Sequence, residues 1–198
     1  AWPDNEEANK IVSKISRTLE NVIGKIKFSE VKTAFDESGI IKNKLDNLIF
    51  QKNVFWGKLE ILLPKRWIIN NKENSVNLEL DKIYQLGLFF EYFEININKK
   101  EKMQDEMVTS FLNEITKDVA VNDQKLVKAG EDSFLFSFYS IENNEGTQFK
   151  NHIWYRICVK DSKILIVSFV FSYKLETKII GEVYYNKINE VIKSSELN

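Results

Sequence analysis

The two residues of this chain best suited to nucleophilic chemistry are its one histidine and its one cysteine, His152 and Cys158. Both lie in segment 151–159, whose alternating pattern predicts a β-strand. The alternation puts the two side chains on one face, but six residues at about 3.3 Å each separate them by roughly 20 Å. A Cys–His pair needs hydrogen-bond contact. We therefore expect a surface or rim histidine and a half-buried structural cysteine.

Patterns for other site chemistries are missing from the sequence. One histidine and one cysteine cannot build a structural zinc site without carboxylates, and no acidic cluster has calcium-loop spacing. The glycines are isolated, and none belongs to a phosphate-binding or dinucleotide-binding motif. Glu101, Asp105 and Glu106 have the spacing of a solvated helix face. The sequence therefore predicts a non-enzyme with no cofactor and no metal, although an enzyme that uses carboxylates alone stays open.

The composition limits the classes of protein to which this chain can belong. A chain of 198 residues with 43% hydrophobic content can bury a substantial core. Its 28 basic and 29 acidic residues leave a net charge of −1, which argues against nucleic-acid binding through phosphate neutralisation. One cysteine excludes an intrachain disulfide, and no apolar run approaches the about 18 residues that span a membrane. The sequence indicates a cytoplasmic protein, or a periplasmic one if the missing N-terminal methionine reflects a cleaved signal peptide.

Surface recognition is the chemistry that remains. Trp56, Trp67 and Trp154 would be strong anchors against a partner, and Arg156 shares a strand face with Trp154 and His152. Two interpretations stay open for these four residues. They either bind a protein or an anionic ligand, or they form a core that helices cover, and for Trp56 we favour the covered core.

The elements that must position these residues begin with helices. Apolar residues at spacings of three and four predict a helix through 11–26, a weaker one at 29–35 that stops at Ser38–Gly39, and a third over 41–49. Alternation then predicts one strand over 54–63, which puts Phe55 and Leu59 on one face and Trp56 on the other. Pro64 ends this strand. A polar turn follows at 70–74, and a strand over 75–80.

The second half of the chain has the clearest pattern. A strand over 88–97 is apolar on both faces, as in a central strand. A helix over 100–117 and a short strand over 125–129 precede three aromatic-rich strands between 132 and 173. Turns at 143–146 and 160–162 join those three strands, and one amphipathic helix over 174–195 ends the pattern. We predict a helical segment, 1–50, packed on a sheet domain, 51–198.

Three pieces of the sequence carry a family resemblance. They are the turn 63-LPKRW-67, the helix at 100–117 between two groups of strands, and a last strand, 164–173, that runs into a helix ending 191-VIKSS-195. Residues 53–196 resemble the PsbP/DcrB-like family, which includes the Mog-type Ran-binding proteins. The first fifty residues have no counterpart in that family. The resemblance implies an α+β fold, an antiparallel β-sheet flanked by helices as an α/β/α sandwich, and it brings no catalytic motif.

Members of this family look like scaffolds and partner binders: photosystem subunits, nuclear-transport regulators, envelope lipoproteins, and chaperones or immunity proteins of type VI secretion systems. By analogy, we expect a bacterial protein-binding module, monomer or homodimer, most simply an immunity protein or adaptor that binds a toxin or secreted effector. The alternative is an envelope-associated ligand carrier or lipoprotein-like scaffold with an apolar pocket between sheet and helix.

Overall fold

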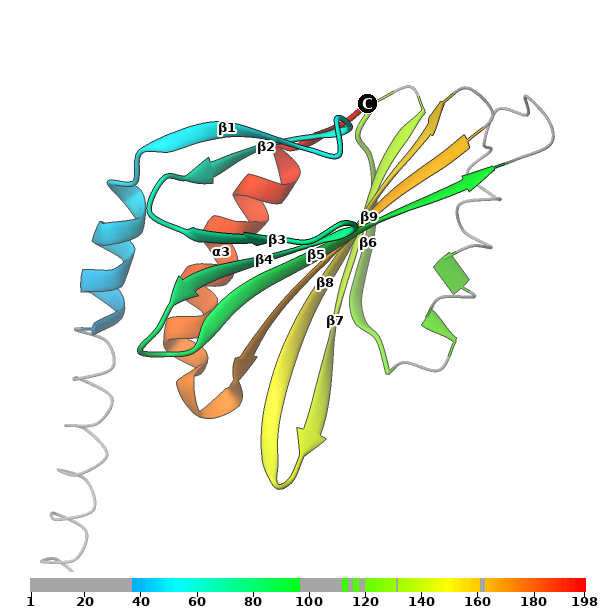
Figure 1. The fold of residues 1–198 in the computed structure, drawn as a ribbon. Coiled ribbons are helices and arrows are strands. Elements are labelled where there is room, and N and C mark those ends of the chain that lie inside the picture. Colours follow the sequence, from blue (N-terminus) through cyan, green and yellow to red (C-terminus); the bar gives the residue numbers. More distant parts are fainter. Residues whose placement is uncertain (1–36, 97–111, 114–115, 118–119, 131, 161–162) are drawn as a thin grey trace, which may run out of the picture.

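The computed structural model describes residues 37–96, 112–113, 116–117, 120–130, 132–160 and 163–198 (Figure 1). Two antiparallel sheets carry the fold. The larger has the strand order β3-β4-β5-β9-β8-β7-β6 and the smaller the order β1-β2-β10. The strands are β1 Phe50–Phe55, β2 Leu59–Pro64, β3 Ile68–Asn71, β4 Ser75–Asp81, β5 Leu86–Asn96, β6 Asn122–Lys128, β7 Ser133–Asn144, β8 Thr147–Lys160, β9 Lys163–Lys174 and β10 Glu196–Leu197.

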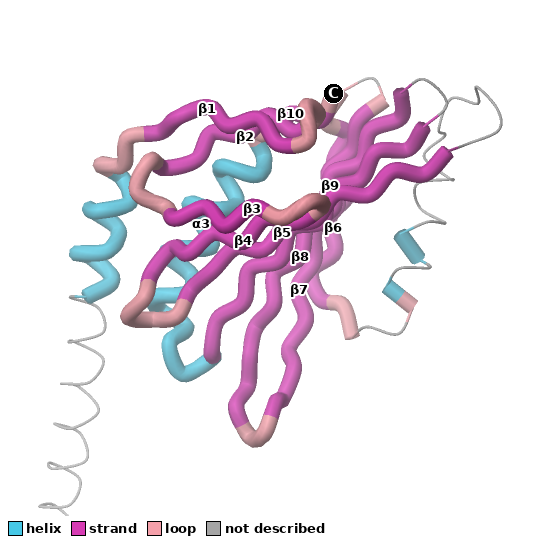
Figure 2. The backbone as a smooth tube through the Cα atoms, viewed as in Figure 1, coloured by secondary structure: helices cyan, strands magenta, loops and turns pink. Residues whose placement is uncertain are grey.

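Helices cover one face of the larger sheet. The chain leaves β9 through a short 3₁₀ turn, Leu175–Thr177, and enters helix α3, Lys178–Lys193, which lies behind β3–β5 in Figure 1. Buried residues of α3 join those of β2 and β9 in the main core. A second core on the opposite face brings Leu112 against Phe136 of β7 and Ile157 of β8. The predicted fold class, an antiparallel sheet flanked by helices, is therefore confirmed (Figure 2).

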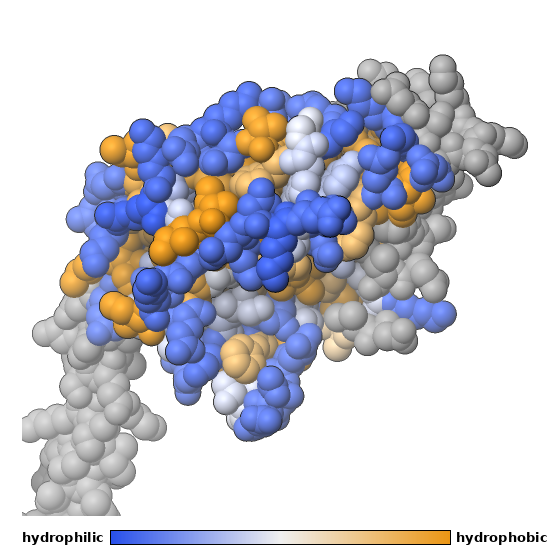
Figure 3. Space-filling model, viewed as in Figure 1, coloured by the Kyte–Doolittle hydropathy of each residue, from blue (hydrophilic) through white to orange (hydrophobic). Residues whose placement is uncertain are grey.

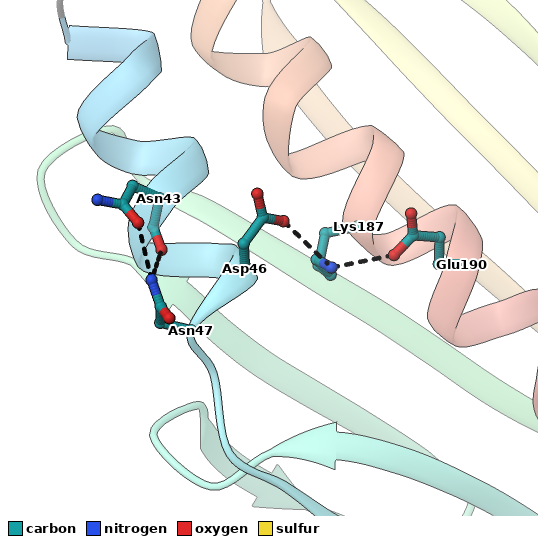
Figure 4. Close-up of polar contacts among 5 residues, drawn as sticks. All are labelled: Asn43, Asp46, Asn47, Lys187 and Glu190. Atoms are coloured by element: carbon teal, nitrogen blue, oxygen red, sulfur yellow. Dashed lines mark hydrogen bonds and ion pairs between the residues drawn. The ribbon is translucent and has the colours of Figure 1, made fainter.

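A shorter helix, residues 37–46, lies beside α3. Its Ile41 and Leu45 are buried in the main core. Lys187 of α3 lies 3.6 Å from the Asp46 carboxylate and 3.0 Å from that of Glu190, so one ammonium joins the two helices (Figure 4). The Asn47 amide closes the shorter helix by donating to the carbonyl oxygen of Asn43, at 2.8 Å. Most of the predicted segment 1–50 lies outside the described residues, so its division from 51–198 stays a prediction.

The three long strands confirm the predicted pattern. β9 is the central strand, and β8 pairs with both β9 and β7 over its length. The predicted turn at 143–146 joins β7 and β8, with Glu145 and Gly146 at φ angles of 50° and 84°. Positive φ at two successive residues is the geometry of a type I′ turn, which matches the twist of the strands.

The predicted single strand over 54–63 is wrong. The chain reverses after β1 through Trp56 and Gly57, at φ angles of 55° and 65°, so that Phe55 pairs with Leu59 of β2. Cross-strand partners share a face, which is why Phe55 and Leu59 are both buried, as the alternation predicted. An alternating pattern does not distinguish one long strand from a hairpin that keeps the same apolar face.

Other boundaries differ from the sequence-based predictions. Gly39 lies inside the helix over 37–46 and does not stop one, and the helix predicted over 41–49 ends at 46. Asn70 and Asn71 belong to strand β3, not to a turn. In β5 one face is buried at Leu88 and Phe90, whereas the end of the strand, from Phe93 on, is exposed on both faces, so β5 is only partly covered. Strand β10 was not predicted, because two residues carry no periodicity.

Candidate functional site

His152 lies on β8 beneath α3. Its ring centroid is 3.9 Å from that of Tyr185 in α3 and 5.7 Å from that of Tyr173 in β9. The residue is 5% exposed, and its Nε2 atom has no hydrogen-bond partner in the part of the chain that the structure describes. The prediction of a surface or rim histidine is therefore wrong. The helix that covers this face begins more than twenty residues later in the sequence.

The surroundings of His152 keep its ring neutral. Burial and, to a smaller extent, the Lys150 ammonium lower the pKa of His152 from 6.5 to about 4, against the opposing effect of the Glu182 carboxylate. A hollow of about 20 Å³, lined in part by Asp123, Tyr139 and Tyr185, reaches the ring from the side of β6. Such a volume holds about one water molecule.

Cys158 lies on the same face of β8, six residues from His152, and is half-buried. Burial raises the pKa of the Cys158 thiol. A reactive cysteine needs the opposite shift, because the thiolate is the nucleophile. The expectation of a structural cysteine agrees with this environment.

A partly buried polar cluster lies beside His152 and joins β8, β9 and α3. The Lys150 ammonium is 2.9 Å from a Glu182 carboxylate oxygen, and the Tyr173 hydroxyl donates to the same oxygen at 2.6 Å. Burial and this bond raise the pKa of Tyr173. Burial raises the pKa of Glu182, but the bonds from Lys150 and Tyr173 outweigh it and lower the pKa. Lys150 of β8 and Tyr173 of β9 both bond to Glu182 of α3, so the cluster holds α3 on the sheet.

The neutral state of His152 makes stability depend on pH. The folded-state pKa lies below the unfolded value of 6.5, so the stabilisation is complete above pH 6.5 and is lost as the pH falls toward 4. We expect the free energy of unfolding to fall by about 2 kcal/mol between pH 6.5 and 4.5, after allowance for solvent screening. The chain has no other histidine. Urea unfolding of the wild type and of His152→Gln at several pH values measures this difference. A slope above pH 5 that is the same in both proteins would contradict the assignment.

Trp154 and Arg156 are enclosed between β8 and α3. Trp154 is 1% exposed and its indole N–H donates to the Asn189 side chain at 3.2 Å. Arg156 is 3% exposed, and its Nη2 donates to the carbonyl oxygens of Ile192 and Lys193, at 3.0 and 3.1 Å. These carbonyls end α3, where the helix dipole favours a cation. Both side chains therefore hold the helix in place, and they do not reach the surface of this conformation.

Trp67 and Trp56 lie at the junction of the two sheets. Trp67 is 4% exposed and belongs to the main core. Trp56 is half-buried in the β1–β2 turn, its ring stacks on Tyr92 of β5 at 5.4 Å, and its indole N–H donates to the Glu73 carbonyl oxygen at 2.8 Å. The structure therefore brings Trp154 and Arg156 together and places Trp67 and Trp56 elsewhere, with only Trp56 partly open to solvent.

A groove of about 650 Å³ lies over β3–β5, on the face of the larger sheet turned away from α3. Its volume is within the usual range of ligand sites. Phe89 and Gly87 of β5 lie in its lining, together with Asn70 of β3 and Asn77 and Glu79 of β4. The groove offers amides, charges of both signs and one aromatic ring.

Sequence reasoning missed this groove. The pattern of β4 identifies its buried side chains, Val76 and Leu78, but gives the polar residues between them no role. Asn70 was assigned to a turn, so its place beside Asn77 across a strand pair could not be foreseen. A row of polar residues at every second position of an alternating strand is the signal that could have indicated the groove.

In the described part of the chain, no three His, Cys, Asp or Glu side chains are grouped closely enough to hold a metal ion. Within the same ranges, no helix has the length and apolar content needed to cross a bilayer.

No protein-family model and no curated protein sequence matches the chain. Among solved structures, the chain is similar to LpqN, a protein involved in cell envelope biogenesis of Mycobacterium tuberculosis. The superposition has a TM-score of 0.54 at 8% identity, over 80% of this chain and 96% of LpqN. The fold is Mog1/PsbP-like.

Weaker likenesses accompany this one. The Ran-binding protein Mog1p of Saccharomyces cerevisiae gives a TM-score of 0.46 at 7% identity, over 76% of this chain and 96% of Mog1p. A protein of Bacteroides thetaiotaomicron gives 0.48 at 18% identity, over 75% of this chain and 48% of its own. At such identities the likeness concerns the fold alone.

Proposed function

We propose that the protein is a non-enzymatic protein-binding module that contacts its partner through the outward face of β1–β5. The observation that supports this proposal most directly is the groove over β3–β5, which adjoins strands with exposed apolar side chains. Concave sites that combine apolar surface with a few polar groups are the usual places of recognition.

Large apolar side chains are solvent-exposed on β1, β2 and β3. Val54 of β1 is 55% exposed, Leu62 of β2 is 46% exposed and Ile68 of β3 is 47% exposed. Val54 and Leu62 are diagonal neighbours across the β1–β2 pair, on the face opposite to buried Ile61. Ile68 pairs with Glu79, which lines the groove. Figure 3 shows apolar side chains in orange among polar ones in blue on this side of the molecule.

The buried aromatic residues support the same choice of surface. Trp67, Trp154 and Arg156 are enclosed by the fold, so a partner would have to open the structure to touch them. Among the four residues predicted to bind a partner, Trp56 alone is positioned for contact without such a change, because it lies in the β1–β2 turn and is half-buried.

Site-specific photo-crosslinking tests the proposed surface. A photoreactive amino acid is placed at Val54 or Leu62 on this face, and at Ile141 or Ile179 as matched controls. The controls are comparably exposed apolar residues, at 47% and 40%, on β7 and α3. In cells of the source organism, we expect one shared crosslinked protein from the first pair and none from the second.

Two results would contradict the proposal. Crosslinks of equal yield from all four positions would show non-specific collisions, and the absence of any crosslink from Val54 and Leu62 would remove this face as a contact surface.

A narrower form of the proposal makes the partner a toxin or secreted effector, with this chain as its immunity protein or adaptor in a type VI secretion-like setting. This form rests on the sequence resemblance, and neither LpqN nor Mog1p carries such a description. Co-expression with the products of adjacent genes tests it. A stable one-to-one complex that suppresses toxicity is expected, and toxicity unchanged by this chain argues against it.

The second candidate is an envelope-associated ligand carrier, which the fold shared with LpqN favours over other non-enzymatic roles. The described hollow lies on the outer face of the sheet and not between sheet and helix, so a carried molecule would be bound at the surface. Native mass spectrometry of the purified protein distinguishes the two: a co-purified small molecule favours the carrier. Cell fractionation would separate a periplasmic carrier from the cytoplasmic module that we propose.

A further inference from the structure

The groove over β3–β5 has a floor made partly of backbone. Gly87 of β5 has no side chain to fill the hollow, and a Cβ atom built there would lie 3.1 Å from the carbonyl oxygen of Leu78. Phe89 follows two residues later on the same face and is half-buried. The floor therefore combines the ring of Phe89 with a stretch of β4 and β5 backbone that no side chain covers at Gly87.

Along β4, the polar residues of the groove repeat every second position. Ser75, Asn77 and Glu79 line it in this way, and a β-bulge after Glu79 ends the alternation before Asp81. Successive members of this series are about 6.6 Å apart, because a strand rises about 3.3 Å per residue. An extended polypeptide laid along β4 has the same two-residue repeat. Its side chains on the groove side would therefore stay in step with this row from Ser75 to Glu79.

Three side-chain amides in the groove have no hydrogen-bond partner among the described residues. Asn70, Asn77 and Gln85 make no side-chain hydrogen bond within the described residues. Each amide has donors and an acceptor in one plane, as a peptide unit does. An extended chain outside a sheet has unpaired N–H and C=O groups that need partners when water is excluded. The three amides can supply such partners.

The charges of the groove are paired at one end only. At the Asp81 end, Lys82 lies 3.5 Å from Glu79, and Asp81 accepts bonds from the Tyr184 hydroxyl and the backbone of the β4–β5 turn. At the other end, the described residues give Lys72 no ion pair. A ligand with a carboxylate at that end and no further charge complements this arrangement.

We propose that the groove binds an extended polypeptide segment of the partner, laid along β4, with an apolar side chain on Phe89 and a carboxylate at Lys72. This inference rests on the proposed protein-binding function and deepens it. The segment lies on the face of the sheet, so it is held by side-chain amides and not by strand addition at an edge.

Selection of linear peptides displayed on phage, with the full chain as bait, tests the inference. We expect enriched peptides that carry an acidic residue and an apolar residue. Chemically synthesised peptides are then titrated by fluorescence anisotropy. The double variant Asn70→Ala/Asn77→Ala should weaken their binding about tenfold, a loss typical of interface residues. Asn71→Ala, on the same strand but outside the groove, should leave the affinity unchanged.

Two further variants separate the roles of the groove residues. Lys72→Glu should weaken acidic peptides at least about tenfold, and high salt should reduce the difference. Phe89→Ala should weaken binding, whereas Phe93→Ala, on the same face of β5 but outside the groove, should not. Thermal unfolding of each variant checks that the fold persists. Asn77 and Lys72 are exposed, so their variants keep the test valid if Phe89→Ala does not fold.

The inference is overturned if no peptide is enriched over the bare support, or if groove and control variants bind the selected peptides equally. Crosslinks from Val54 and Leu62 that persist in the Asn70→Ala/Asn77→Ala variant would then leave the proposed function standing without the groove. If the groove binds no peptide and no crosslink forms from Val54 or Leu62, both proposals are wrong.

Discussion

Gly181→Ala is expected to destabilise the protein by about 1–2 kcal/mol. A Cβ atom at this position of α3 would lie 2.7 Å or less from three ring atoms of Tyr173, closer than side chains pack. The ring cannot retreat, because Tyr173 is 2% exposed and its hydroxyl is bonded to Glu182. Overpacking of this kind costs about 1–3 kcal/mol and exceeds the gain of about 1 kcal/mol from alanine's helix propensity.

A second glycine provides the matched control. Gly39 lies in the helix over 37–46, is exposed and has no atom within 4 Å of a Cβ built on it. Gly39→Ala should therefore be neutral or stabilise the protein by up to about 1 kcal/mol. Urea unfolding followed by circular dichroism measures both variants. Adding Tyr173→Leu to Gly181→Ala should recover part of the loss, because the smaller side chain gives the new methyl group room. Equal stability of Gly181→Ala and the wild type would contradict the packing of α3 on β9.

Arg156→Met is expected to cost about 2 kcal/mol and Arg156→Ala about 4 kcal/mol. Both remove the two charge-assisted bonds to the carbonyl oxygens that end α3. Methionine keeps the packing of the aliphatic stem, whereas alanine also leaves a cavity beneath the helix. Both variants also relieve the burial of a guanidinium that is 3% exposed and whose Nε atom is without a partner among the described residues. That relief reduces both costs, and the difference between them comes from the cavity.

Arg66→Met is the control for loss of charge, because Arg66 is exposed on the β2–β3 connection. Its unfolding free energy should change by less than about 0.5 kcal/mol. Hydrogen exchange of the last turn of α3 provides a second readout, since exchange there should accelerate in both Arg156 variants. If Arg156→Ala unfolds at the same urea concentration as Arg66→Met, the enclosed guanidinium does not hold the end of α3.

The parts of the fold that the sequence predicted are those whose signal is local. Strands β7, β8 and β9 alternate over many residues, and the turn with Gly146 needs a residue that tolerates positive φ. Trp56 shows the limit, because it adopts a φ of 55° that a bulky residue rarely takes, so that Gly57 is the one residue of this pair whose type favours a turn.

The candidate site was less accessible to sequence reasoning because it depends on contacts between distant segments. His152 is buried by Tyr185, and Trp154 is covered by the helix that contains Asn189. The pattern of β8 left two interpretations of this face, and only the position of α3 decides between them. The groove likewise depends on Asn70 and Asn77 meeting across a strand pair.

The pairing of β10 with β2 has a consequence for the order of folding. Glu196 and Leu197 pair with Glu60 and Leu59, and Leu197 is 5% exposed in the main core. A ribosome makes β2 long before it makes β10, so the smaller sheet stays a two-stranded hairpin, which is marginally stable in water, until nearly the whole described chain has been made. Contacts between residues so far apart in sequence slow folding, because the loop between them must close first. During that interval the inner face of β2, with Leu59, Ile61 and Leu63, is uncovered and open to chaperones.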